Sequence, residues 1–211
     1  MNFEGISCSE AAKQSLSLAF QEARLPHAIL LEGPAGSGKS ELARLIAKAA
    51  VCTGEGERPC GHCPGCIKAA AGAHPDITIV GGGTAARSFH VDTIRQIRAD
   101  AYIKPNEAPL RVFLLEGAET MSEQAQNALL KVFEEPPDRG LFLLTVTSAV
   151  KLLPTVRSRA QLFTLEGEEQ ADPADLELAA AICQAIPAPG EAKLLELTAP
   201  LIKDKERFRR I

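Results

Sequence analysis

The sequence has few aromatic residues and no long apolar segment. Its 211 residues include no tryptophan, one tyrosine and eight phenylalanines, so a core has to be built mainly from leucine, isoleucine, valine and alanine. No apolar run approaches the roughly 20 residues that a membrane-spanning helix requires. The first residues also lack a basic stretch followed by an apolar one, the pattern of a secretory signal. We therefore expect a cytoplasmic protein that does not enter a membrane.

An excess of positive charge is also missing. The formal net charge is −4 at pH 7, whereas a protein that coats nucleic acid by itself needs a basic face for the phosphates. The run Lys203 to Arg210 is one candidate basic patch, but its mixed charges are more typical of a solvated helix end. Apolar residues make up 45% of the chain and charged residues 24%, which is the balance of a folded globular protein.

Short apolar segments alternate with segments of helical periodicity along most of the chain. Strands are predicted at 27–33, 77–80, 110–117, 141–147 and 161–165, and helices at 9–24, 39–51, 91–102 and 122–135. Strands that are apolar throughout and alternate with helices predict an α/β fold, with a parallel sheet flanked by helices on both sides. The chain turns polar after residue 166. We therefore expect a core at 1–166 and a short helical segment, resembling a lid or a linker, at 167–211.

Residues 33–40 match the phosphate-binding pattern G-x-x-x-x-G-K-[ST] in full: Gly33, Pro34, Ala35, Gly36, Ser37, Gly38, Lys39 and Ser40. The pattern follows a predicted strand and opens a predicted helix, which favours a true phosphate loop over a chance glycine-rich turn. Glycines let backbone N–H groups turn toward an anion, and the helix start is positive. Lys39 is expected to reach the β- and γ-phosphates of ATP, and Ser40 to ligate Mg²⁺.

The acidic residues that accompany such a loop are incomplete. Hydrolysing P-loop ATPases end a buried strand in a metal-binding acid, often followed by a second acid that positions water. Here the strand at 110–117 offers Glu116, but Gly117 occupies the next position. Glu116 can support the metal through a water molecule, and Glu119 is a displaced candidate for the second acid. We expect this chain to bind ATP weakly or non-productively, and whether it is an ATPase stays open.

Four of the six cysteines lie within fifteen residues. They form the pattern C-x₇-C-x₂-C-x₂-C with Cys52, Cys60, Cys63 and Cys66. In a chain without a secretory signal, such crowding indicates metal binding rather than disulfides. Four thiolates make the closed tetrahedral shell of structural zinc. An iron–sulfur cluster and free thiols are the alternatives. We therefore predict a zinc knuckle, inserted into the α/β core at residues 52–66.

Four motifs in this order resemble bacterial DNA polymerase III clamp-loader subunits, which are AAA+ proteins. They are the phosphate loop, the cysteine insertion after its helix, NALLKVFEEPP at 127–137 and TVRSR at 155–159. The resemblance covers roughly residues 10–165. It implies a P-loop AAA+ core that carries the zinc insertion.

Two branches of that family carry this set of motifs, the ATPase tau/gamma subunit and the delta-prime subunit. The ATPase branch reads Asp-Glu where this chain has Glu116 and Gly117. The segments HPDITIV at 74–80 and VDTIRQIR at 91–98 look like delta-prime sequences of Gram-positive type. We therefore favour the delta-prime type. Glu191 stands where the lid of AAA+ proteins usually supplies an arginine, so we expect that this chain does not couple its own nucleotide to motion in the usual way.

The resemblance also implies roles for two residues near the end of the core. Ser158-Arg159-Ala160 matches the family's Ser-Arg-Cys motif, whose arginine projects into the ATP site of the neighbouring subunit. The alternative for Arg159 is an ordinary surface arginine. Thr147 falls at the position of the family's sensor-1 polar residue.

The implied function is that of a largely static clamp-loader subunit in DNA replication. Its expected partners are the tau/gamma ATPase and delta subunits, with the sliding clamp and primer-template DNA reached through the complex. An active tau/gamma-type ATPase and a nucleotide-independent zinc-containing scaffold are the alternative readings.

Overall fold

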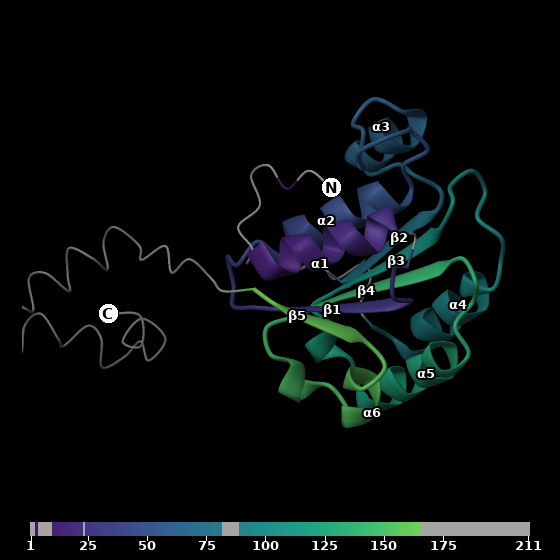
Figure 1. Cartoon of the computed structure of the whole chain (residues 1–211). Coiled ribbons are helices and arrows are strands. Elements are labelled where there is room, and N and C mark those ends of the chain that lie inside the picture. The colour runs from purple at the N-terminus through teal and green to yellow at the C-terminus, as the bar shows by residue number, and fades with distance from the viewer. Residues whose placement is uncertain (1–2, 4–9, 23, 82–88, 166–211) are drawn as a thin grey trace, which may run out of the picture. The chain divides into compact units, whose positions relative to one another are not determined.

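A five-stranded sheet forms the centre of the computed structural model, which describes residues 3, 10–22, 24–81 and 89–165 (Figure 1). The strands are β1 (Ala28–Glu32), β2 (Ile77–Gly81), β3 (Arg111–Glu116), β4 (Gly140–Val146) and β5 (Gln161–Thr164). All pairs are parallel, in the order β2-β3-β4-β1-β5. The predicted parallel α/β sheet is confirmed.

Helices cover both faces of this sheet, as Figure 1 shows. They are α1 (Glu10–Gln21), α2 (Lys39–Ala50), α3 (Pro64–Ala70), α4 (Val91–Ala101), α5 (Glu123–Glu134) and α6 (Pro154–Arg157), with 3₁₀ turns η2 (Ala118–Thr120) and η3 (Ala149–Lys151). Apolar residues of α1 and α2 pack on one face, and those of α4, α5 and α6 on the other. The chain divides into units 1–168 and 169–211. The predicted helical segment at 167–211, with Glu191, lies outside the described residues.

Strand β4 lies at the centre and is buried along its whole length. Successive side chains of a strand point to opposite faces, so Phe142 packs with the α4–α5 layer and Leu143 with the α1–α2 layer. The scarce aromatic residues gather there. Phe142 stacks on Phe113 at a centroid distance of 5.1 Å and meets Phe133 edge-on at 5.3 Å. Aliphatic side chains supply most of the remaining core, as the composition predicted.

Local signals set several element ends. Ser122 caps α5, because its Oγ accepts a hydrogen bond from the N–H of Ala125 at 3.3 Å. Strand β3 ends at Glu116, since Gly117 adopts a left-handed conformation with φ +73°. The sequence did not predict α3, which begins within the cysteine insertion and continues past residue 66. Pro64 starts this helix with its fixed backbone angle, a position that proline favours.

A buried carboxylate fixes the loop between α4 and β3. Asp76 is fully buried and accepts hydrogen bonds from the backbone N–H groups of Asn106 at 2.6 Å, Glu107 at 2.9 Å and Ala108 at 2.9 Å. The side-chain amide of Asn106 donates a fourth at 3.2 Å. Burial opposes ionisation, but these donors outweigh it and lower the pKa of Asp76 below its usual value.

Candidate nucleotide and metal sites

The phosphate loop connects β1 to α2 at the carboxyl edge of the sheet. Gly36 and Gly38 have φ angles of +79° and +74°, which only glycine adopts without strain. Gly33 leaves no room for a side chain, since a Cβ there would collide with the Ser37 hydroxyl. Gly38 caps α2 without a side-chain bond. The first-turn amides of α2 therefore have no side-chain acceptor at the helix N-cap, the arrangement that favours an anion.

Two side chains of the loop have the contacts expected around a phosphate cradle. The Nζ of Lys39 donates to the carbonyl oxygen of Pro34 at 2.8 Å, so the lysine folds back over the turn. Ser37 is 2% exposed, and its Oγ has no hydrogen-bond partner. A buried hydroxyl without a partner is costly, so a ligand oxygen at this position would satisfy it.

The acid at the end of β3 is held by an arginine of α2. Glu116 is 8% exposed, and Arg44 approaches both of its carboxylate oxygens. Nη2 and Nε of Arg44 lie 3.1 Å and 3.2 Å from Oε1. Ser40 and Arg44 are four residues apart on α2, so they share a helix face. That spacing is a sequence signal that places Arg44 beside the site, although Arg44 was not among the predicted site residues.

Thr147 directly follows β4 at the same edge and binds Glu119. Its backbone N–H and its Oγ1 donate to one oxygen of Glu119, at 3.0 Å and 2.8 Å. Burial opposes ionisation of Glu119, but the two hydrogen bonds outweigh it and lower the pKa of this carboxyl. Glu119, the displaced candidate for a second acid, is therefore engaged by Thr147. The two residues form a polar contact between the ends of β3 and β4.

Arg159 lies just after α6, on the opposite side of the sheet from α2. Its Nη2 is 3.1 Å from Glu134 on α5, and its Nη1 donates to the carbonyl oxygen of Thr155 at 3.1 Å. The side chain is 35% exposed. Within the described residues, its recorded hydrogen bonds are to α5 and α6 and not to residues 33–40. The structure thus brings Glu116, Thr147 and the phosphate loop to one edge, and holds Arg159 apart from them.

The four cysteines of the insertion converge on one point. Their sulfur atoms all lie within 4.8 Å of one another. The Sγ atoms of Cys52 and Cys63 are 3.9 Å apart, and those of Cys60 and Cys66 are 4.0 Å apart. Tetrahedral zinc with Zn–S bonds of about 2.3 Å requires sulfurs about 3.8 Å apart, whereas a disulfide requires about 2 Å. The four side chains therefore fit zinc.

Backbone donors favour the thiolate form of these cysteines, whereas burial opposes it. The N–H groups of Cys60, Cys63 and Cys66 each lie 3.4 Å from a cysteine sulfur of the cluster. Burial raises the pKa of Cys66 to about 12. At Cys63 burial acts in the same direction, but donors from Cys66 and Thr53 outweigh it and lower the pKa to about 5. A Cβ on Gly54 would collide with the Cys60 sulfur, so glycine is needed where the chain wraps the cluster.

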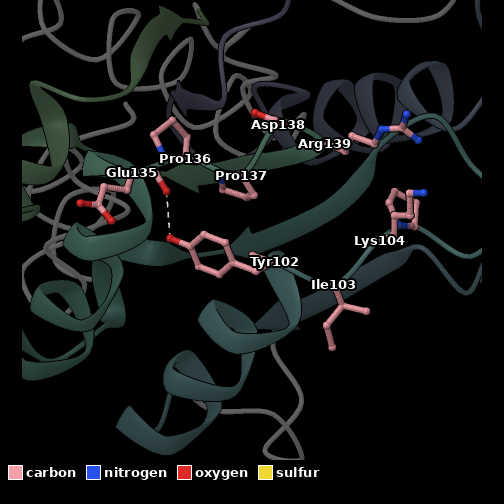
Figure 2. A pocket seen from close by; sticks show the side chains of 10 residues that line it. Tyr102, Ile103, Lys104, Glu135, Pro136, Pro137, Asp138 and Arg139 are labelled. Carbon is pink, nitrogen blue, oxygen red and sulfur yellow. Dashed lines mark hydrogen bonds between the residues drawn. The ribbon is translucent and has the colours of Figure 1, made fainter.

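A cavity of about 560 Å³ lies at the opposite edge of the sheet (Figure 2). Its walls come from the segment after α4 and from residues 135–139, which precede β4. Figure 2 shows the Tyr102 hydroxyl bonded to the Glu135 carbonyl oxygen, at 2.8 Å. The cavity is separate from the phosphate loop, because that loop follows the carboxyl end of β1. Among the described helices, none is long and apolar enough to cross a membrane.

Two sequence comparisons with known proteins point to subunits of DNA polymerase III. The family model described as DNA polymerase III, delta subunit, matches residues 8–169. The DNA polymerase III subunit gamma/tau of Mycobacterium bovis is 36% identical over 159 residues, which cover 75% of this chain and 27% of that protein. The delta' subunit of Pseudomonas aeruginosa is 35% identical over 184 residues, covering 85% of this chain and 48% of that protein.

A solved gamma subunit-related protein of Thermotoga maritima aligns with a TM-score of 0.48 and 18% identity, over 92% of this chain and 56% of that one. The chain spans between about a quarter and a half of the length of the curated relatives described above.

Proposed function

The chain belongs to the DNA polymerase III, delta subunit family, and from this premise we propose that it acts as a delta-prime-type clamp-loader subunit. The membership confirms the resemblance to clamp-loader subunits of the AAA+ type. In this role the chain binds ATP weakly or non-productively and donates Arg159 to the ATP site of a neighbouring subunit. Its partners are the tau/gamma ATPase and delta subunits, and it reaches the sliding clamp and primer-template DNA through the complex.

The phosphate loop supports nucleotide binding. Within residues 33–40, two glycines adopt positive φ angles, and no side chain caps the amides at the start of α2. The lysine folds back over the turn. These groups suit the β- and γ-phosphates, and Thr147 lies at the same edge. Ser40 would hold Mg²⁺, and the ion would offset the negative charge of the phosphates.

The acidic residues support binding without turnover, and they carry the proposal. Glu116 is paired with Arg44, Gly117 follows it, and Glu119 is engaged by Thr147. Activation of an attacking water needs a carboxylate or another base that can reach it. At the end of β3, Glu116 is paired with Arg44 and Gly117 offers no side chain, so the usual position of the base is empty. Glu119 keeps one oxygen without a hydrogen-bond partner but is displaced from that position.

The contacts of Arg159 support a role toward another subunit. Its guanidinium is partly exposed and is oriented by Glu134 and by the carbonyl of Thr155. A positioned, permanently charged guanidinium is suited to the charge that develops on a γ-phosphate. The zinc knuckle has a structural part in this proposal, because four thiolates close the coordination shell of the ion and leave no position for a substrate.

An active tau/gamma-type ATPase is the second candidate. The intact phosphate loop and the 36% identity to a gamma/tau subunit favour it. A zinc-containing scaffold that does not use nucleotide is the third. Titration of the purified chain with ATP, followed by a turnover assay, separates the three. Binding with negligible turnover supports the delta-prime proposal, turnover supports the second candidate, and no binding supports the third.

The arginine role needs the assembled ring. The chain, with or without Arg159→Ala, is combined with tau/gamma ATPase and delta subunits, and single-turnover hydrolysis is measured. We expect hydrolysis at the adjoining site to fall by on the order of 10³, while ATP binding by this chain is unchanged. Arg95→Ala is the matched control, because Arg95 also pairs with an acid on the surface. If both variants support hydrolysis equally, the role assigned to Arg159 is wrong.

A further inference from the structure

We propose that Arg44 takes the place of a divalent cation at Glu116, so that this chain binds nucleotide with an affinity that depends little on Mg²⁺. The proposal rests on the nucleotide binding proposed above and concerns the same site. P-loop ATPases hold Mg²⁺ with the loop Ser or Thr and an acid at the end of a buried strand, yet here that acid already has a cationic partner.

The ion pair joins a buried acid to an arginine whose side chain is 63% exposed. Glu116 is 8% exposed, so its carboxylate needs a partner to offset the loss of water. Arg44 provides two hydrogen bonds, from Nε at 3.2 Å and from Nη2 at 3.5 Å, to the two different oxygens. Glu116 is therefore paired with a cation that α2 holds in reach.

The other described acids at this edge each have one oxygen engaged. Glu32, the last residue of β1, accepts the backbone N–H of Ala149 at 2.7 Å through Oε1. Glu119 accepts both hydrogen bonds of Thr147 on Oε1, and its Oε2 is buried without a hydrogen-bond partner. Gly117 supplies no side chain. A metal at the phosphates would have Ser40 as a protein ligand, and Glu116 would be available to it only if Arg44 moved away.

Electrostatics opposes a metal at Glu116 while Arg44 stays in place. A dication near the carboxylate would also lie near the guanidinium, and the repulsion would cancel much of the attraction. Mg²⁺ also gives up its water reluctantly and requires octahedral geometry. Arg44 removes the reason for Mg²⁺ to bind the protein at this position, although Mg²⁺ remains free to bind the phosphates.

The test is calorimetric titration of the chain with a non-hydrolysable ATP analogue, in excess Mg²⁺ and in excess EDTA. For the wild type, we expect the two dissociation constants to agree within about threefold. Arg44→Gln frees the carboxylate, so Mg²⁺ should then tighten binding by at least about tenfold. Adding Glu116→Gln to Arg44→Gln should abolish that gain. Arg95→Gln is the control, since Arg95 matches Arg44 in exposure at 63%.

The outcomes of this titration distinguish failure of the inference from failure of the nucleotide-binding function. Wild-type binding that differs more than about threefold between Mg²⁺ and EDTA overturns the inference and leaves nucleotide binding intact. No binding under either condition refutes the nucleotide-binding function itself. If Arg44→Gln does not fold, as judged by circular dichroism, Glu116→Gln alone serves. In this variant, the ratio of the dissociation constant in EDTA to that in Mg²⁺ should equal the wild-type ratio. A lower ratio would show that Glu116 binds the metal.

Discussion

Replacement of Asp76 by asparagine tests whether one buried carboxylate holds the loop between α4 and β3. Four donors converge on it, two on each oxygen: the backbone and side-chain amides of Asn106 on Oδ1, and the backbone N–H groups of Glu107 and Ala108 on Oδ2. Asparagine keeps one carbonyl oxygen, so it can satisfy one pair of donors. The other pair would face the NH₂ group, which does not accept hydrogen bonds.

The magnitude follows from those two lost bonds. A hydrogen bond to a charged group contributes about 1.5 to 3 kcal/mol, so two lost bonds amount to roughly 3 to 6 kcal/mol. Asn106 and Glu107 are exposed and water can reach their donors, which places the loss near about 3 kcal/mol. For a domain of this size, the corresponding fall in Tm is about 6 to 12 °C.

Urea unfolding followed by circular dichroism measures the effect, with Asp92→Asn as the control because Asp92 is 89% exposed. The pKa of Asp76 is lowered in the folded state, so its stabilisation is complete above the ordinary aspartate pKa of about 3.9 and is lost at lower pH. The difference in free energy of unfolding between wild type and Asp76→Asn should therefore stay constant from pH 7 to 5 and shrink below about pH 4. A gap under about 1 kcal/mol at pH 7 would refute the reasoning.

Three further changes have expected outcomes. Elemental analysis should find one zinc ion in the purified chain. Cys63→Ser should release this ion and lower the free energy of unfolding by on the order of 3 kcal/mol, measured by thermal melting. Unchanged metal content in the variant would contradict the site. Ser122→Ala should lower the free energy of unfolding by about 1 kcal/mol through loss of the α5 cap. Ser148→Ala should have little effect, because Ser148 starts η3 without a side-chain cap bond. Equal losses for the two variants in urea unfolding would contradict the cap. Gly81→Ala should destabilise more than Gly117→Ala: both glycines have positive φ, but only at Gly81 would a Cβ collide, with the Glu116 carbonyl oxygen.

Features that depend on neighbouring residues were predicted well from the sequence. Residues 33–40 identify a phosphate loop because their glycines, lysine and serine act within one turn. The helix predicted from residue 122 begins at the cap Ser122, whose partner is only three residues away. The cysteine spacing predicted a shared metal site, and the four sulfurs lie together. Uniformly apolar strands predicted the parallel sheet, since burial on both faces leaves that pattern.

Features that join distant segments were not predicted. Arg44 and Glu116 are 72 residues apart, and Asp76 and Asn106 are 30 apart. Such pairs depend on how α2 and the strands pack, and no local propensity encodes them. The same holds for Glu119, whose partner Thr147 directly follows the neighbouring strand β4. The helix α3 was missed for another reason, because its seven residues are too few for a clear periodicity.

The placement of the cysteine knuckle has a consequence for how its metal and a nucleotide affect each other. The knuckle follows the last turn of α2, and the phosphate loop precedes the first. The twelve residues of α2 separate them by about 18 Å. At physiological salt, charges interact over about 8 Å, so the metal ion and a triphosphate would scarcely sense one another's field. Nucleotide binding would therefore depend little on the charge of the zinc ion, although α2 joins the two sites.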